Sequence, residues 1–357
     1  MIETENLPSE VENALNDLTA HYQDFEAINR GANGYLFFAK NKVSKMDVAI
    51  KFYAGEPGEN RHDEPRQLSA LTCPNVLPIL EARSISDEWA FFMTPRCFEG
   101  DIDDIIGSNP SVHKALDIAV GICAGVSSIH AAGMIHRDLK PGNIVILDGT
   151  PRIADFGSVT AIEEGQQDVG ASRHSILWRP PESFETERYS IKGDVYQVGI
   201  AVYQLLGGKL HYDGMEYLSK KQRKYFEAIT DAVDQSIFVD EVIKDKALKG
   251  KLVDIKTLPG WLDSRTRRTI KIMCHHDIDT RPDSVADVAA MLTTIRSRVA
   301  NWKWKGTTAL LERDGSIIEF RSTNNADEYI AHKDRGTGFR RIPKFGVGSL
   351  SQLASKL

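Results

Sequence analysis

The spacing of hydrophobic and polar residues changes about a quarter of the way along this chain. Between Tyr22 and Met93 the apolar segments are short and rich in aromatic and β-branched residues, which predicts strands over 35–39, 47–53 and 88–93. Further on, apolar residues recur at helical spacing in three stretches, 112–130, 194–206 and 265–296. The pattern predicts an α+β fold, with a small β-rich lobe followed by a larger helical lobe.

The first twenty residues lie outside this pattern. They are acidic and carry Val11, Leu15 and Leu18, a spacing that predicts a short amphipathic helix. A solvated N-terminal extension over 1–21 is the alternative.

The last part of the chain also has no place in a two-lobe layout. Residues 309–320 alternate around Asp314-Gly315, a dipeptide typical of two-residue hairpin turns, so we expect a small appended module over 299–357. Residues 301–357 hold ten Lys and Arg against six Asp and Glu, interleaved with aromatic residues such as Trp302 and Trp304. Such a segment can bind nucleic acid or a protein partner, or it can dock on its own neighbouring domain.

Composition narrows the class of protein. The 357 residues are 41% hydrophobic, which suffices for about two domains with a sizeable core. The net charge of −6 gives the whole chain no nucleic-acid or membrane footprint, and the most apolar stretch, 195–208, is too short to span a bilayer. The N-terminus has no secretory pattern, and the cysteines are scattered without metal-ligand spacing. We therefore expect a soluble cytoplasmic protein with reduced thiols.

Two short segments carry the chemistry. One is the run His136-Arg137-Asp138-Leu139-Lys140-Pro141-Gly142-Asn143, and the other is Asp155-Phe156-Gly157. Phosphoryl transfer needs a carboxylate beside the attacking hydroxyl, a positive charge near the terminal phosphate and oxygen ligands for a metal ion. These segments supply all three, and Arg179-Pro180-Pro181-Glu182 follows at a suitable distance.

In order and spacing, these motifs resemble those of the eukaryotic-like serine/threonine protein kinase family. The resemblance implies a bilobal kinase domain over 22–298, with an N-lobe at 22–93 and a C-lobe at 97–298. It implies ATP with Mg²⁺, or with Mn²⁺ in its place, and transfer of the γ-phosphate to Ser and Thr hydroxyls of protein substrates. A pseudokinase scaffold is the competing interpretation.

The resemblance also assigns roles in catalysis. Asp138 would orient the substrate hydroxyl as the catalytic base, and Lys140 would neutralise charge on the transferred phosphoryl group. Asn143 and Asp155 would hold the metal ion through oxygen ligands. His136 and Phe156 are better interpreted as packing residues that align these groups.

ATP binding is implied by a second set of residues. The segment 29–36 resembles the kinase glycine-rich loop, with Gly31 and Gly34 in place and Asn29 replacing the first glycine. Lys51 follows an apolar Val-Ala-Ile run and would bind the α- and β-phosphates. Its expected partner is Glu64, with Glu59 as the alternative, because Pro65 suits only the first turn of a helix.

The adenine ring would lie between Leu36, Ala49 and Val145. Met93 resembles the gatekeeper residue, which borders the adenine pocket, and 94–96 resembles the hinge between the lobes. Asp101 would bind ribose, or is simply a solvated acid.

Substrate type and regulation rest on the segment between the two motif regions. Residues 175–182 resemble the peptide-docking segment, with Ser175 contacting Asp138 and Lys140, and Glu182 should pair with Arg281. Lys140 is typical of serine/threonine kinases. Arg137 before the catalytic aspartate is typical of kinases activated by phosphorylation, here at Ser158, Thr160 or Ser172, which indicates autophosphorylation. Alternatively, Arg137 satisfies backbone carbonyls and Glu163, Glu164 or Asp168 takes the place of the phosphate.

Overall fold

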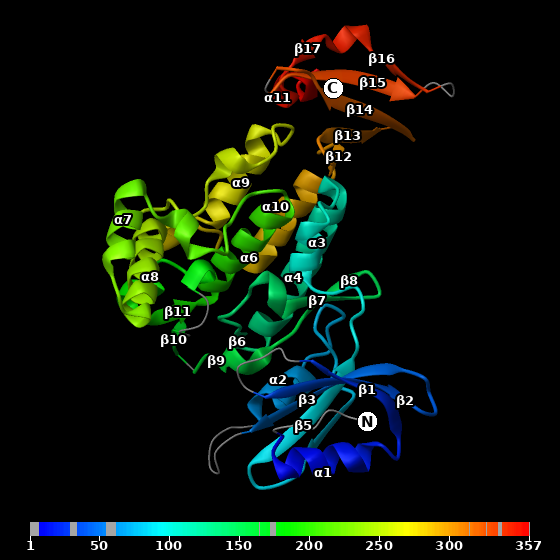
Figure 1. Cartoon of the computed structure of the whole chain (residues 1–357), viewed down its shortest axis with the longest axis vertical. Coiled ribbons are helices and arrows are strands. Elements are labelled where there is room, and N and C mark those ends of the chain that lie inside the picture. Colours follow the sequence, from blue (N-terminus) through cyan, green and yellow to red (C-terminus); the bar gives the residue numbers. More distant parts are fainter. Residues whose placement is uncertain are drawn as a thin grey trace.

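The structure is a computed structural model that describes residues 7–28, 34–54, 62–163, 165–171, 176–313, 315–325, 327–334 and 338–356. Three parts follow one another along its longest axis: a small β-rich lobe, a larger helical lobe and a C-terminal β-rich module (Figure 1). The first two confirm the predicted bilobal α+β fold.

The small lobe is built on an antiparallel sheet with the strand order β1-β2-β3-β5-β4. The predicted strands correspond to β2, β3 and β5, whereas the sequence patterns named no strand at β1 or β4. The helix α2 (Asp63–Ala70) packs beside the sheet and has Pro65 in its first turn, as the sequence indicated. The strand bounds are β1 (Tyr22–Ile28), β2 (Tyr35–Asn41), β3 (Asp47–Ala54), β4 (Glu81–Ser84) and β5 (Trp89–Pro95).

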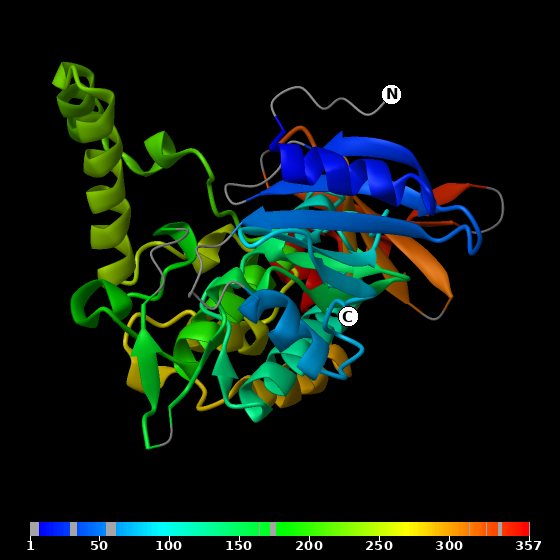
Figure 2. The ribbon, with the colours of Figure 1, turned by 90° about the horizontal axis from the view of Figure 1, so that it is seen from below.

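The N-terminal helix α1 (Ser9–Leu18) lies across the outer face of this sheet (Figure 2). Its apolar stripe, Val11, Leu15 and Leu18, is fully buried against Phe37 and Ile50. The predicted amphipathic helix is therefore present. It belongs to the core of the small lobe and is not a solvated extension.

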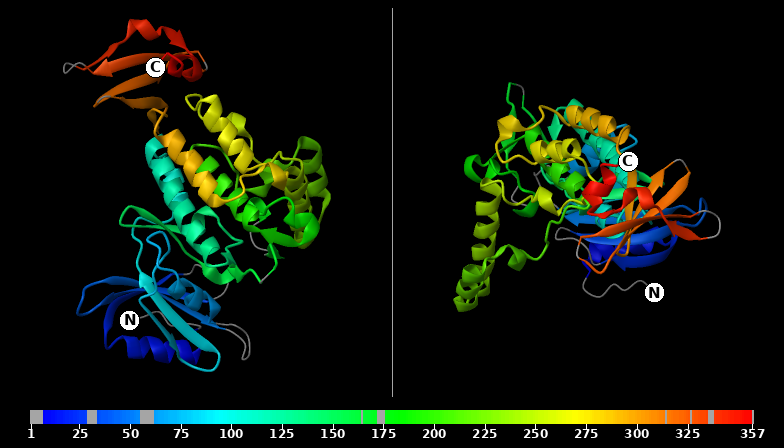
Figure 3. Two further views of the ribbon diagram at one scale, coloured as in Figure 1. Left: turned by 180° about the vertical axis from the view of Figure 1, so that it is seen from behind. Right: turned by 90° about the horizontal axis from the view of Figure 1, so that it is seen from above.

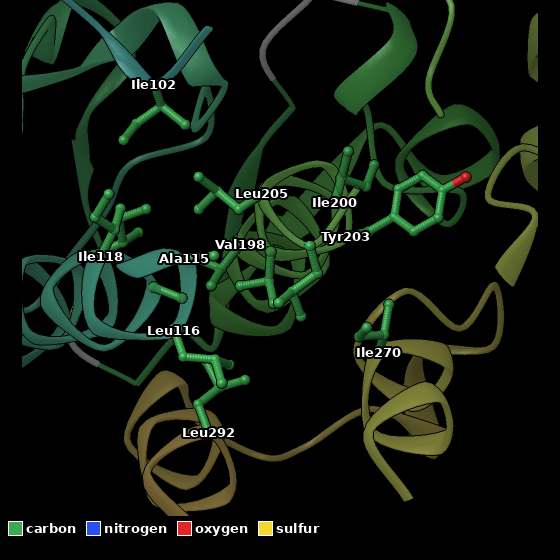
Figure 4. Packing of buried hydrophobic residues seen from close by; sticks show 14 of the residues in the cluster. Ile102, Ala115, Leu116, Ile118, Val198, Ile200, Tyr203, Leu205, Ile270 and Leu292 are labelled. Atoms are coloured by element: carbon green, nitrogen blue, oxygen red, sulfur yellow. The ribbon is translucent and has the colours of Figure 1, made fainter. Parts of the chain in front are cut away.

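The helical lobe is centred on α4 (Val112–Ala131) and α6 (Ile191–Leu205), which pack against each other and against α10 (Val285–Arg296). Leu116 of α4, Val198 of α6 and Leu292 of α10 point into one continuous core (Figure 4). By length and apolar composition α4 alone, among the described helices, could cross a membrane, but its apolar residues fill this core.

The stretch 265–296 was predicted as helical throughout, and this is wrong. It forms α9 (Ser264–Met273) and α10, separated by a loop that contains Arg281-Pro282, because proline cannot continue a helix. The other helices of this lobe are α3 (Ile102–Gly107), α5 (Ser183–Thr186), α7 (Lys220–Ala228) and α8 (Ala232–Leu248). Its short strands are β6 (Met134–Ile135), β7 (Ile144–Leu147), β8 (Thr150–Ile153), β9 (Thr160–Ala161), β10 (Asp168–Gly170) and β11 (Arg188–Ser190).

The C-terminal module lies on the helical lobe at the end opposite the small lobe (Figure 3). Trp302 is buried and stacks on Trp261 of the helical lobe at a centroid distance of 5.4 Å. The module therefore docks on the helical lobe of the same chain. The predicted hairpin is present, with Arg313 opposite Ser316. The module comprises β12 (Asn301–Lys305), β13 (Thr308–Arg313), β14 (Ser316–Ser322), β15 (Tyr329–Asp334), β16 (Phe339–Arg341), β17 (Val347–Gly348) and α11 (Leu350–Ala354).

Candidate active site

The loop that carries Asp138 is held in place by a fully buried carboxylate, that of Asp194 in α6. Its oxygens accept hydrogen bonds from the backbone N–H groups of His136 at 2.9 Å and Arg137 at 3.0 Å, and from His130 Nε2 at 2.7 Å. Burial alone would raise the pKa of this carboxyl, but the His130 hydrogen bond and the nearby His136 ring hold the pKa below its usual value. Asp194 therefore stays ionised and anchors the loop.

A second anchor, Gln197, was not among the predicted site residues. Its Oε1 accepts from the Leu139 N–H at 2.7 Å, and its Nε2 donates to the carbonyls of Arg137 and Trp178 at 3.3 and 3.2 Å. It thereby joins the catalytic loop to the docking segment. The available signal was a glutamine flanked by apolar residues of a helix, since a buried amide needs partners.

Asp138 lies at the centre of the site with its two carboxylate oxygens in different environments. Oδ2 accepts from Lys140 Nζ at 2.8 Å and from Asn143 Nδ2 at 3.0 Å. Oδ1 is buried and has no hydrogen-bond partner among the described residues. Because an unpaired buried carboxylate oxygen is costly, this atom is the part of the site best suited to accept a hydrogen bond from a ligand.

Lys51 of β3 reaches across to α2. Its Nζ lies 2.8 and 2.9 Å from the two carboxylate oxygens of Glu64, and 3.7 Å from Asp155 Oδ1. Burial by itself would lower the pKa of Lys51, but the two carboxylates raise it above its ordinary value. The structure thus contains the Lys51–Glu64 pair that the sequence favoured, and Glu59 lies outside the described residues.

Asp155 adopts a left-handed backbone conformation with φ 56° and precedes a short 3₁₀ turn over Phe156–Ser158. Phe156 is buried and meets the His136 ring edge-to-face at 5.5 Å, which agrees with the packing role expected for both residues. Burial favours the neutral acid, but Lys51 and His136 hold the pKa of the Asp155 carboxyl below its usual value. Asp155 is therefore a carboxylate.

A divalent cation fits this arrangement. Asn143 directs its amide nitrogen to Asp138, which leaves its amide oxygen as a possible metal ligand, and Asp155 offers an ionised carboxylate. Both are the hard oxygen ligands that Mg²⁺ prefers. No group of three or more His, Cys, Asp or Glu in the described part of the chain could cage a metal, so phosphates and water would have to complete the shell.

The strand register corrects one predicted residue, Met93. In an antiparallel pair, residues directly opposite each other point to the same face, and β3 pairs with β5 so that Ala49 faces Thr94 and Ile50 faces Met93. Lys51 marks the cleft face, so Ala49 and Thr94 share that face. Met93 points to the other face and is fully buried under α1. Met93 therefore does not border the cleft, and Thr94 lies on the face expected of the gatekeeper residue. The prediction was wrong by one residue, which moves a side chain to the opposite face of a strand.

The structure also describes four other residues predicted to bind the nucleotide. Leu36 pairs with Lys51 and lies on the cleft face, and Val145 forms a bridge with Asp101 at the lobe junction. Asp101 also caps α3 by accepting from the Asp104 N–H at 3.2 Å, which gives it a structural role. Gly34 has no room for a side chain, because an added Cβ would lie 2.0 Å from the Phe52 carbonyl oxygen.

Several predicted residues lie outside the described part of the chain. They belong to the glycine-rich loop, the activation and docking segment and the hairpin turn: Asn29, Gly31, Glu164, Ser172, Ser175 and Asp314.

The docking segment is fixed by the predicted ion pair between Glu182 and Arg281, with nitrogen–oxygen distances of 2.9 and 2.6 Å. Arg281 is buried and also donates to the carbonyls of His275 and Lys192. Removing one partner of such a pair would leave an uncompensated buried charge.

Arg137 makes the contacts expected of its alternative role, in which it satisfies backbone carbonyls. Its guanidinium donates to the carbonyls of Ser158 and Gly170, both at 2.6 Å, and to the Thr160 hydroxyl at 2.5 Å. The activation segment is further tied by the pairing of β10 with β11 and by an ion pair between Asp168 and Arg188. Protein contacts therefore already hold this segment.

Comparison with known proteins agrees with this geometry. The protein kinase domain family model matches residues 22–291, so the chain belongs to the protein kinase family. It is 26% identical over 263 residues to the mitogen-activated protein kinase hog-1 of Neurospora crassa, which covers 71% of this chain and 69% of that kinase. It is 27% identical to the mitogen-activated protein kinase mpkC of Aspergillus niger, over 71% of this chain and 64% of that kinase. Membership implies a phosphotransferase that uses ATP with a divalent metal and acts on proteins.

Proposed function

We propose that this protein is a serine/threonine kinase that transfers the γ-phosphate of Mg-ATP to Ser and Thr hydroxyls of proteins. The observation that carries the proposal is the asymmetric environment of Asp138, whose Oδ2 is held by Lys140 and Asn143 while Oδ1 has no partner among the described residues. Oδ1 would accept the hydrogen bond of the substrate hydroxyl and orient its oxygen for attack.

Lys140 would act in the same step by a different route. Its ammonium already contacts Asp138 Oδ2, so it lies where charge develops on the transferred group, and it would stabilise that charge. Bound metal supplies charge neutralisation between the phosphates. Asn143 and Asp155 would hold it through their oxygens, and Lys51, oriented by Glu64, would hold the α- and β-phosphates.

The adenine would enter between Leu36, Ala49 and Val145, with Thr94 at the back of the pocket. Beyond Thr94, the Pro95 carbonyl can accept from the adenine amino group. The Cys97 N–H donates to no group in the described part of the chain, which leaves it as a donor for the ring. Specificity for Ser and Thr is supported by Lys140 and by the names of the mitogen-activated relatives.

Autophosphorylation in the activation segment forms part of the proposal. The Thr160 hydroxyl contacts Arg137, so a phosphate there would meet a guanidinium at once, and Ser172 is the other candidate. Because Arg137 already holds two carbonyls, we expect such a phosphate to reinforce an ordered segment rather than to create it.

A direct assay tests this function. Purified protein is incubated with radiolabelled ATP, Mg²⁺ and casein, and the labelled product is hydrolysed for phosphoamino-acid analysis. Phosphoserine and phosphothreonine that require Asp138 support the proposal. Phosphotyrosine as the main product would contradict the serine/threonine assignment, and no turnover on any protein would favour a scaffold role.

A further inference from the structure

A small hollow lies between α9 and α10, on the part of the helical lobe from which the chain leaves for the C-terminal module. Its volume is about 290 Å³. Alanine and threonine side chains leave this space between the two helices, and Ile295 and Met291 line it with apolar surface. The lining residues are Arg265, Thr269, Ala290, Met291, Thr294, Ile295 and Arg298.

Arg265 and Arg298 of this hollow are exposed, and neither forms an ion pair with the described residues. Arg265 forms no ion pair or hydrogen bond through its side chain in the described structure. Among the described residues, Arg298 donates only through Nε, to the Thr294 carbonyl at 3.0 Å, so its two terminal nitrogens can contact a ligand. Neighbouring arginines differ, since Arg296 pairs with Asp117 and Arg267 donates to four backbone carbonyls.

A hydroxyl group lies beside the two arginines. Thr269 is only 9% exposed and lines the hollow, yet its hydroxyl has no hydrogen-bond partner among the described residues. Thr293 and Thr294, by contrast, donate to the carbonyls of Ala289 and Ala290 one turn earlier. The Thr269 hydroxyl can therefore donate to a ligand with acceptor oxygens that enters the hollow.

Two guanidinium groups and a hydroxyl donor in a hollow without acidic lining residues match a phosphoryl group, which has acceptor oxygens and nearly two negative charges. A volume of about 290 Å³ lies at the lower limit for ligand pockets and suits one modified side chain better than a nucleotide. We infer that this hollow binds a phosphorylated side chain of a protein partner. Only two residues separate Arg298 from the start of β12, so the ligand would contact the linker to the module.

Fluorescence anisotropy with the full-length chain tests the inference. The probe is a fluorescein-labelled Gly-Ala-phosphoserine-Ala-Gly peptide, and its unphosphorylated twin is the first control. The protein carries Asp138→Asn and is saturated with ATP, so that neither turnover nor the nucleotide site contributes to the signal. A chain that failed the phosphotransfer assay could still pass this one.

We expect the phosphopeptide to bind and the twin not to bind. Arg265→Ala and Arg298→Ala should each weaken binding about tenfold, the usual loss for one hydrogen bond to a charged group. Arg268→Ala is the matched control, because Arg268 lies on the same helix but does not line the hollow, and it should bind as the parent does. Thr269→Val should weaken binding severalfold with unchanged melting.

Two results would overturn the inference. Equal losses from Arg265→Ala and Arg268→Ala would show general charge attraction and no site. Inorganic phosphate that binds as tightly as the phosphopeptide would show that the peptide contributes nothing, and would replace a protein partner by the free anion.

Discussion

Glu64 and Lys51 form an ion pair across the gap between α2 and β3, although only thirteen residues separate them and α2 is an eight-residue helix. The same lysine lies 3.7 Å from Asp155, so one cation joins the small lobe to the 155–157 turn of the large lobe. The pair is half-buried and its lysine stays charged, which is what alignment of anionic phosphates requires.

The first prediction concerns this pair. Lys51→Met should strongly reduce turnover, and Glu64→Gln should reduce it less because the lysine remains. Combined, the two changes should cost no more than Lys51→Met alone, since the glutamate acts through the lysine. Steady-state kinetics of the double-mutant cycle measure this. Strictly additive losses, or a larger effect of Glu59→Gln, would move the functional partner away from Glu64.

The second prediction tests whether Thr94 or Met93 borders the adenine pocket. Thr94→Gly removes a side chain from the cleft face and should admit an ATP analogue with a bulky substituent on the adenine amino group. Met93→Gly instead empties a buried position under α1 and should reduce the free energy of unfolding by about 2–5 kcal/mol. Analogue turnover and denaturant unfolding measure the two effects. Analogue use by the Met93 variant alone would restore Met93 as the gatekeeper.

Much of the candidate site could be predicted from the sequence. The loop 136–143 and the 155–157 turn are short, local and rich in polar residues whose chemistry is readable one by one, and the structure brings Asp138, Lys140, Asn143, Lys51 and Asp155 into one site. The prediction that Met93 borders the adenine pocket was wrong because side chains alternate between the two faces of a strand. An error of one residue in register therefore moves a side chain to the opposite side of a sheet.

Anchoring residues were harder to find. Asp194 and Gln197 were predicted only as part of the helical stretch 194–206, because their partners are backbone groups about sixty residues away, which no local pattern reveals. Likewise, the acidic helix α1 gave a correct amphipathic pattern, but a stripe of apolar residues does not say which surface will cover it.

The third prediction concerns α1. Leu15 is fully buried against the sheet, so Leu15→Ala should lower the free energy of unfolding by about 2–5 kcal/mol. Val43 is 91% exposed, and Val43→Ala should change stability by less than about 0.5 kcal/mol. Urea denaturation of both variants decides between an integral helix and a detachable one. A loss no greater for Leu15→Ala than for the control would make α1 detachable.

The fourth prediction is a pH dependence of stability. The His136 ring is fully buried, and burial lowers its pKa below the usual value of about 6.5. Below that usual value the unfolded chain takes up a proton that the folded chain does not, so stability is complete above it and is lost as the pH falls towards the folded pKa. Unfolding measured from pH 7 to pH 5 should therefore show declining stability, with a shallower decline for His136→Gln. Identical slopes would show that His136 does not titrate in this range.

The asymmetry of Asp138 is tested most directly by replacing its carboxylate. Asp138→Asn keeps the size of the side chain but removes the charge and the acceptor that Oδ1 would offer to the substrate hydroxyl. The account predicts that kcat for casein phosphorylation falls by about 10²-fold or more, with the melting temperature and the KM for ATP little changed. Turnover near the wild-type value in a correctly folded variant would contradict it.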